Sequence, residues 1–208
     1  MQRLLGGAIA AFAWFGLGLQ LVLIVAARPG EAAIAIVNFF SFFTILSNIL
    51  VALLTTARVA APNLGIGRFF ARPAVAASVT LYIAVTGIIY FTILRHLWDP
   101  EGLAFVADAL LHYATPLLFL IYWLAFLPKG VLGFGDLPKM LVFPLVYVVY
   151  SLIRGAITGT YPYPFISVVD LGYPQTLLNI LGMTAVFSVC AGLLVLIDRA
   201  LGPRSQAR

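Results

Sequence analysis

The chain has 208 residues, of which 63% are hydrophobic and only 9% are charged. Soluble domains carry roughly 25% charged residues, so this chain lacks the charge that a water-facing surface requires. Its mean hydropathy of +1.09 also excludes an ordinary soluble fold. The length suits one compact bundle and leaves no room for a second sizeable soluble domain. The sequence therefore predicts an integral membrane protein with a single domain over residues 1–208.

Six apolar stretches are long enough to cross a bilayer as helices. A hydrocarbon core of about 30 Å requires about 20 apolar residues in a helix. Segments rich in proline and glycine separate the stretches, and the alternation typical of a membrane barrel is not visible in the sequence. The first stretch is too long to be the core of a cleaved signal peptide. We expect an all-α bundle of six transmembrane helices over residues 4–27, 37–57, 74–94, 107–127, 137–157 and 176–197.

The basic residues predict how the bundle is oriented. If both termini share a side with the loops after the second and fourth helices, that side carries nine basic residues and the opposite side carries three. Cytoplasmic loops are enriched in Lys and Arg, so both termini should face the cytoplasm. The net charge of +5 then requires no nucleic-acid partner. The nine are Arg3, Arg58, Arg68, Arg72, Lys129, Lys139, Arg199, Arg204 and Arg208, and the three are Arg28, Arg95 and Arg154.

Polar side chains recur inside the predicted helices, where each requires a partner or a wet cavity. In the second helix, one face at helical spacing carries Ser41, Thr44 and Asn48, while Asn38 and Ser47 point away from it. At 1.5 Å per residue, Thr44 in this helix and a histidine in the fourth both lie on the order of 10 Å below the outer boundary. We therefore expect a polar cavity in the outer half of the bundle. The candidate site residues are Ser41, Thr44, Asn48, Asp108, His112, Arg154 and Asn179.

These residue types can perform acyl transfer. A hydroxyl requires a base within hydrogen-bond reach, so Thr44 and His112 form a possible nucleophile and base. Asp108, one turn before His112, can orient the imidazole. Ser41, Asn48, Arg154 and Asn179 are candidate contacts to the substrate or to the oxyanion, and Arg154 or Asn179 can also hold a carboxylate.

The residues also leave two non-catalytic interpretations open. One is a small polytopic carrier or sensor that binds a lipid carboxylate, and the other is a structural subunit whose polar stripes pack helices together. A threonine in a transmembrane helix commonly bonds the carbonyl four residues earlier, which for Thr44 is that of Phe40. No spacing of residues suggests a zinc site.

Three short motifs are similar to those of a known protein family. The segments FFSFFTILSN (39–48), HYATPLLF (112–119) and GTYPYPF (159–165) occur in this order. Together they resemble the androgen-induced and androgen-dependent tissue-factor-pathway-inhibitor-regulating family of multipass membrane hydrolases, including its bacterial members.

The resemblance implies a threonine esterase that acts without metal or cofactor. By motif, Thr44 is the nucleophile and His112 its partner, and Tyr163, Pro164 and Phe165 shape the mouth of the site. The implied substrate is a fatty acid ester of a hydroxy fatty acid or a similar acyl ester. The implied location is the cytoplasmic membrane of a bacterium, while the acyl chain length and the oligomeric state stay open.

Overall fold

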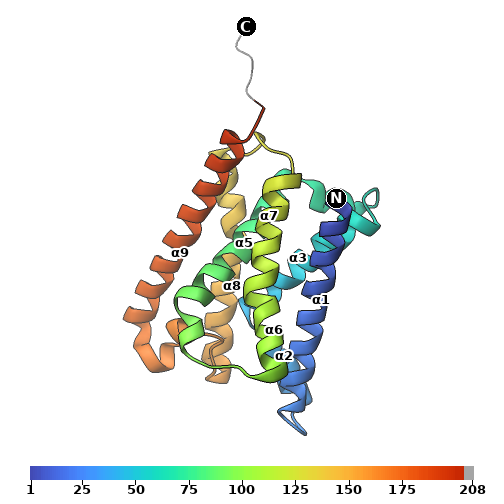
Figure 1. Cartoon of the computed structure of the whole chain (residues 1–208). Helices are drawn as coiled ribbons and strands as arrows, with labels where there is room; N and C mark the ends of the chain where they lie inside the picture. The colour runs from blue at the N-terminus through green and yellow to red at the C-terminus, as the bar shows by residue number, and fades with distance from the viewer. Residues whose placement is uncertain (204–208) are drawn as a thin grey trace.

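The computed structural model describes residues 1–203, which form helices and connecting loops with no strand among them. Six helical segments are long and apolar enough to cross a membrane, which confirms the predicted all-α, multi-pass bundle (Figure 1). The helices are α1 (Gln2–Ala26), α2 (Ala32–Phe39), α3 (Phe43–Ala60), α4 (Gly65–Ala71), α5 (Pro73–Thr92), α6 (Gly102–Ala109), α7 (Thr115–Phe126), α8 (Leu137–Thr158) and α9 (Val168–Ala200). Shorter helical turns are η1 (Leu94–His96), η2 (Leu110–Ala114), η3 (Phe134–Asp136) and η4 (Pro164–Ile166).

The first helix begins and the last helix ends at the same end of the bundle (Figure 1). We call this the terminal end and the other the loop end. The helix α4 lies at the terminal end, whereas the connection from α5 to α6 lies at the loop end. Of the basic residues expected on the terminal side, Arg204 and Arg208 lie outside the described residues. The assignment of the terminal end to the cytoplasm stays a prediction.

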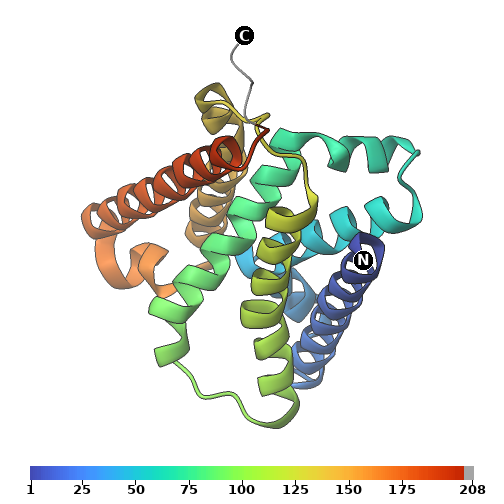
Figure 2. The same ribbon diagram turned by 45° about the horizontal axis from the view of Figure 1, so that its top comes forward.

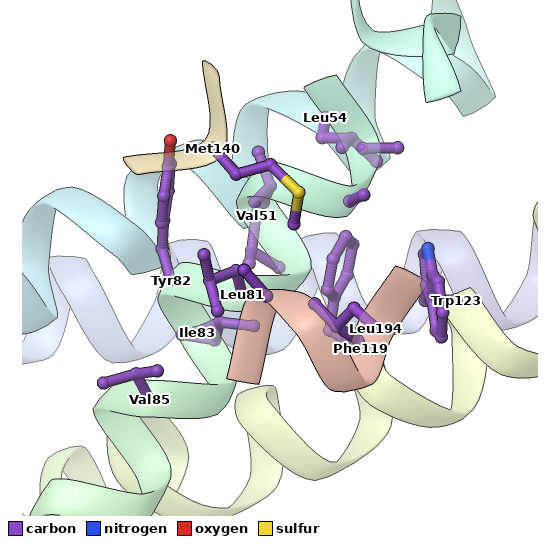
Figure 3. Packing of buried hydrophobic residues seen from close by; sticks show 14 of the residues in the cluster. Val51, Leu54, Leu81, Tyr82, Ile83, Val85, Phe119, Trp123, Met140 and Leu194 are labelled. Carbon is purple, nitrogen blue, oxygen red and sulfur yellow. The ribbon is translucent and has the colours of Figure 1, made fainter. Parts of the chain in front are cut away.

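The core is built around α5, the most buried of the spans. The helices α3, α7, α8 and α9 pack against it, and α1 packs on the far side of α3 (Figures 1 and 2). Lipid tails are as apolar as these side chains, so close packing, more than removal of apolar surface from water, holds such helices together. Figure 3 shows interlocking side chains from five helices: Val51, Leu54, Leu81, Ile83, Val85, Phe119, Trp123, Met140 and Leu194.

The second predicted helix, residues 37–57, is broken in the structure. The helix α2 ends at Phe39 and α3 begins at Phe43, with extended backbone at Phe42 (φ −86°, ψ 130°). Backbone that leaves the helix at membrane depth requires partners from the protein or from a cavity. Tyr147 supplies one by donating its hydroxyl to the carbonyl of Ser41 at 2.9 Å. The expectation of one continuous helix was therefore wrong, because partners from other helices stabilise the break.

The fourth span also departs from a regular helix. It runs from α6 through the π-helical turn η2 into α7, so it begins at Gly102 and not at residue 107 as predicted. Pro116 has no N–H to donate to the carbonyl of His112, and a proline ring crowds the carbonyl four residues earlier. The wider π turn relieves this crowding, and such turns occur often at functional sites.

The sixth span is preceded by a short helical segment that was not predicted. The helix α9 begins at Val168, whereas the hydropathy pattern predicted a start at residue 176. Its first turns include a kink at Gly172, whose backbone has φ 72° and ψ 163°, shortly before Pro174. A side chain is strained at this positive φ, so glycine suits the kink.

Candidate active site

The structure brings Thr44 and His112 together. Thr44 is the second residue of α3, and His112 lies in the π turn η2. The Thr44 Oγ1 and His112 Nε2 atoms lie 3.3 Å apart. Both side chains line a cavity of about 690 Å³. The cavity lies at the loop end of the bundle, since connecting residues such as Trp98 and Tyr161 also line it.

Asp108 lies on the opposite side of the imidazole. Its Oδ1 atom is 3.0 Å from His112 Nδ1, and its side chain is only 5% exposed. The alignment of these two atoms falls outside hydrogen-bond geometry, and neither has another partner within the described residues. Contacts between catalytic groups are often poorly aligned before substrate binds. The resulting order of groups is carboxylate, imidazole and hydroxyl.

Tyr90 fixes both Asp108 and His112. Its hydroxyl donates to Asp108 Oδ2 at 2.5 Å. Its ring stacks on the imidazole of His112, with centroids 3.8 Å apart and planes 13° from parallel. Because Tyr90 belongs to α5, the central helix holds the carboxylate and the imidazole in place.

Asn48 connects α3, which carries Thr44, to the π turn that carries His112. Its Nδ2 donates to the carbonyl of Thr44 at 2.8 Å and to the carbonyl of Leu111 at 3.1 Å. Both N–H bonds of the carboxamide are therefore engaged with backbone. The amide positions the start of α3 against the π turn.

Ser41 and Arg154 also line the cavity. The Ser41 hydroxyl donates to the carbonyl of Val37 at 2.7 Å. Arg154 donates to the carbonyl of Thr160 at 3.0 Å and to the side-chain oxygen of Asn38. Both residues thus brace the wall of the cavity, and their predicted contacts with substrate stay predictions.

Asn179 is not brought to Thr44. Its Nδ2 donates to the carbonyl of Phe165 at 2.9 Å, and its Oδ1 accepts a hydrogen bond from Gln175 at 2.8 Å. It therefore holds the segment before α9, which contains Tyr163, and lies outside the residues that line the cavity.

The structure adds residues that sequence periodicity placed elsewhere. Asn38 lines the cavity, and Ser47 is fully buried, with its hydroxyl donating to the carbonyl of Thr44 at 3.0 Å. Both were expected to point away from the polar face, which was wrong for Asn38; Ser47 lies outside the residues that line the cavity, and its hydroxyl contacts that of Thr86 in α5 at 3.0 Å. The break before α3 shifts the phase between Asn38 and Thr44, so a single helical wheel does not describe this segment.

A second, apolar pocket adjoins Thr44. It lies between α3, α5, α8 and α9, and its lining includes Phe43, Ile89, Met183 and Phe187. Thr44 and Tyr163 line both this pocket and the larger cavity. Thr44 therefore lies at the junction of a polar and an apolar compartment.

No group of three or more His, Cys, Asp or Glu side chains that could hold a metal ion lies within residues 1–203. Comparisons with protein-family models, with curated proteins and with solved structures find no match to this chain.

Proposed function

We propose that this chain is a membrane-embedded lipid-ester hydrolase in which Thr44 is the nucleophile and His112 the base. The supporting observation is the series of contacts from Thr44 Oγ1 to His112 Nε2 at 3.3 Å and from His112 Nδ1 to Asp108 Oδ1 at 3.0 Å, beside an open cavity. A nucleophile, a base within reach and a group that orients the base are the shared features of hydroxyl-based acyl transfer.

In the first half of the reaction, Thr44 Oγ attacks the ester carbonyl carbon while its proton passes to His112 Nε2. The tetrahedral intermediate collapses, the bond to the alcohol oxygen breaks, and His112 returns the proton to that oxygen. The products are a free alcohol and an acyl-threonine. Asp108 stabilises the imidazolium that forms between these two proton transfers.

In the second half, water enters from the polar cavity and attacks the acyl-threonine. His112 takes a proton from this water, and the intermediate expels Thr44 Oγ, which recovers a proton from the imidazolium. The free fatty acid leaves, and the site returns to its starting state. Water reaches this point because Thr44 lines the larger, more polar compartment.

The two compartments favour an acyl ester as substrate. The apolar lining of the pocket beside Thr44 matches the chemistry of an acyl chain, and its volume of about 70 Å³ limits it to the part of the chain next to the carbonyl. Arg28 and Arg154 line the polar cavity, so an alcohol part that carries a carboxylate would meet a cationic partner there. A fatty acid ester of a hydroxy fatty acid has both features. With the predicted orientation, the cavity opens to the outer face of a bacterial cytoplasmic membrane.

The test uses detergent-solubilised full chain, a fluorophosphonate probe and p-nitrophenyl octanoate. Thr44→Ala and His112→Ala should each abolish labelling and hydrolysis at unchanged expression. Thr92→Ala serves as the matched control, because Thr92 is an exposed helical threonine that lines neither the cavity nor the apolar pocket. Mass spectrometry should locate the adduct on Thr44.

Two outcomes would count against the hydrolase. If the Thr44→Ala variant is labelled as strongly as wild type, Thr44 is not the nucleophile. Stabilisation of the wild-type chain by fatty acids, without turnover of any acyl ester and without an adduct, would favour the carrier or sensor instead.

A further inference from the structure

A hydrolase of this kind must stabilise the negative charge that develops on the carbonyl oxygen when Thr44 attacks. Hydrogen-bond donors about 3 Å from that oxygen are the usual means. Of the side chains that the sequence suggested for this role, Asn48 donates both of its N–H bonds to backbone carbonyls, Asn179 lies outside the cavity lining, and Arg154 is bonded to the carbonyl of Thr160 and to Asn38. None of them forms a hydrogen bond with the Thr44 side chain, so donors that contact Thr44 directly are better placed to serve the oxyanion.

Two donors lie directly beside the nucleophile. One is the backbone N–H of Thr44 itself, which donates to the hydroxyl oxygen of Tyr163 at 3.2 Å. The other is that hydroxyl, which lies 3.4 Å from Thr44 Oγ1. Because Thr44 is the second residue of α3, its N–H has no carbonyl acceptor within the helix. The same helix end carries partial positive charge, which favours a developing anion.

We propose that the Thr44 N–H and the Tyr163 hydroxyl form the oxyanion hole, which makes Tyr163 a further catalytic residue; this role rests on the hydrolase proposed above. On binding, the ester carbonyl oxygen takes a position between the two donors. The Tyr163 hydrogen turns from Thr44 Oγ1 to that oxygen. When Thr44 Oγ bonds to the carbonyl carbon, the π electron pair moves to the oxygen, which accepts both hydrogen bonds.

Tyr163 stabilises this charge without giving up its proton. Burial raises the pKa of Tyr163, and the hydrogen bond with Thr44 opposes this rise only in part. The phenol therefore stays a donor throughout the neutral range. The proton transfers are left to His112, whose Nε2 approaches Thr44 Oγ1.

The ring of Tyr163 is held independently of its hydroxyl. It stacks on Phe165, with centroids 5.1 Å apart and planes 7° from parallel, and meets the edge of Phe42 at 5.8 Å. The hydrogen bond from Asn179 to the carbonyl of Phe165 fixes the same segment to α9. Removal of the hydroxyl alone should therefore leave the ring in place.

The test is Tyr163→Phe in the full chain, with p-nitrophenyl octanoate as substrate. Loss of one oxyanion donor should lower kcat about 10²- to 10³-fold, with little change in KM or in the unfolding temperature. Tyr173→Phe is the matched control, because Tyr173 is exposed at the same end of the bundle and lies outside both compartments.

A second measurement separates an oxyanion donor from a residue that only supports the fold. In the thionoester analogue of the substrate, sulfur replaces the carbonyl oxygen and accepts hydrogen bonds poorly. The wild-type chain should prefer the ester, and Tyr163→Phe should lose most of that preference. A kcat within about threefold of wild type, or an unchanged preference for the ester, would overturn the oxyanion role.

The outcomes also distinguish this proposal from the hydrolase on which it rests. If wild type turns over the ester, Thr44→Ala does not, and Tyr163→Phe behaves as wild type, only the oxyanion role is lost. If wild type has no turnover, or if Thr44→Ala labels as well as wild type, the hydrolase fails and the oxyanion role fails with it.

Discussion

Replacement of Asp108 by Asn tests whether this buried carboxylate acts through His112. The carboxamide has nearly the same volume and can still accept the Tyr90 hydroxyl, so the packing should survive. An amide that turns its NH₂ group toward His112 Nδ1, 3.0 Å away in the wild-type chain, places the imidazole hydrogen on Nε2. That hydrogen then faces Thr44 Oγ1, and the ring can no longer take the hydroxyl proton.

The loss of charge sets the size of the effect. The carboxylate and imidazolium charges are each shared by two atoms, so the effective separation is about 4 Å. At an effective dielectric constant of about 20, two unit charges at this distance attract by about 4 kcal/mol. Asp108 is only 5% exposed, so water screens the pair little. A loss of about 4 kcal/mol in the transition state corresponds to about a 10³-fold lower kcat.

The assay measures initial rates on p-nitrophenyl octanoate together with the unfolding temperature of each variant. Asp108→Asn should lower kcat with little change in KM, because Asp108 acts on the imidazole and not on the bound ester. Asp99→Asn is the control, since Asp99 is an exposed carboxylate at the same end of the bundle. Rates within about threefold of wild type for Asp108→Asn would refute the orienting role and leave Thr44 and His112 as the only catalytic pair.

Two further changes probe the π turn and the apolar pocket. Pro116→Ala restores an N–H that can donate to the carbonyl of His112 and so permits a regular α-helical turn. Fluorophosphonate labelling of Thr44 should slow while the unfolding temperature is kept or raised, and an unchanged labelling rate would mean that the π turn does not position the base. Met183→Trp fills the apolar pocket, so kcat/KM for p-nitrophenyl octanoate should fall about tenfold while that for the acetate ester is kept. Equal losses for both esters would contradict an acyl-chain pocket.

The membrane architecture was predictable because it depends on quantities that a sequence carries directly. Hydrophobic length identifies a span, and all six spans appear in the structure. The ends of the spans were less predictable. The start of α9 at Val168 depends on a kink at Gly172 and on a cap in which Ser167 accepts the N–H of Asp170, and hydropathy reports neither.

Part of the site was predictable for a similar reason. Helical spacing placed Thr44 and His112 in one layer, and the structure brings them to 3.3 Å. Helical periodicity did not predict that Tyr90 would bond Asp108 or that Tyr163 would bond Thr44. Tyrosines are common in and near membrane spans, and each of these hydroxyls finds its partner on a different element of the fold. The Tyr-Pro-Phe motif directed attention to Tyr163, but only the structure places its hydroxyl beside Thr44.

The break between α2 and α3 explains why the Thr44 hydroxyl does not bond the carbonyl four residues earlier, as several other threonines of the bundle do. Thr55, Thr80 and Thr86 each donate to the carbonyl four residues earlier, at 2.8 to 2.9 Å. Sequence reasoning allowed the same bond from Thr44 to Phe40. The extended backbone at Phe42 interrupts the helix between these two residues, and the Thr44 hydroxyl instead contacts His112 and Tyr163.

The same break exposes the Thr44 N–H at a helix start, where a continuous helix would have paired it with a carbonyl. One local departure from helical geometry therefore leaves both the Thr44 hydroxyl, the proposed nucleophile, and the Thr44 N–H to partners outside the helix. The backbone groups that lose their helical hydrogen bonds at this break are bonded instead by distant parts of the chain. Tyr147 donates to the carbonyl of Ser41, and Tyr163 accepts the N–H of Thr44. A structural subunit that used its polar residues only to pack helices would have no need for this arrangement, because an unbroken helix satisfies its own backbone.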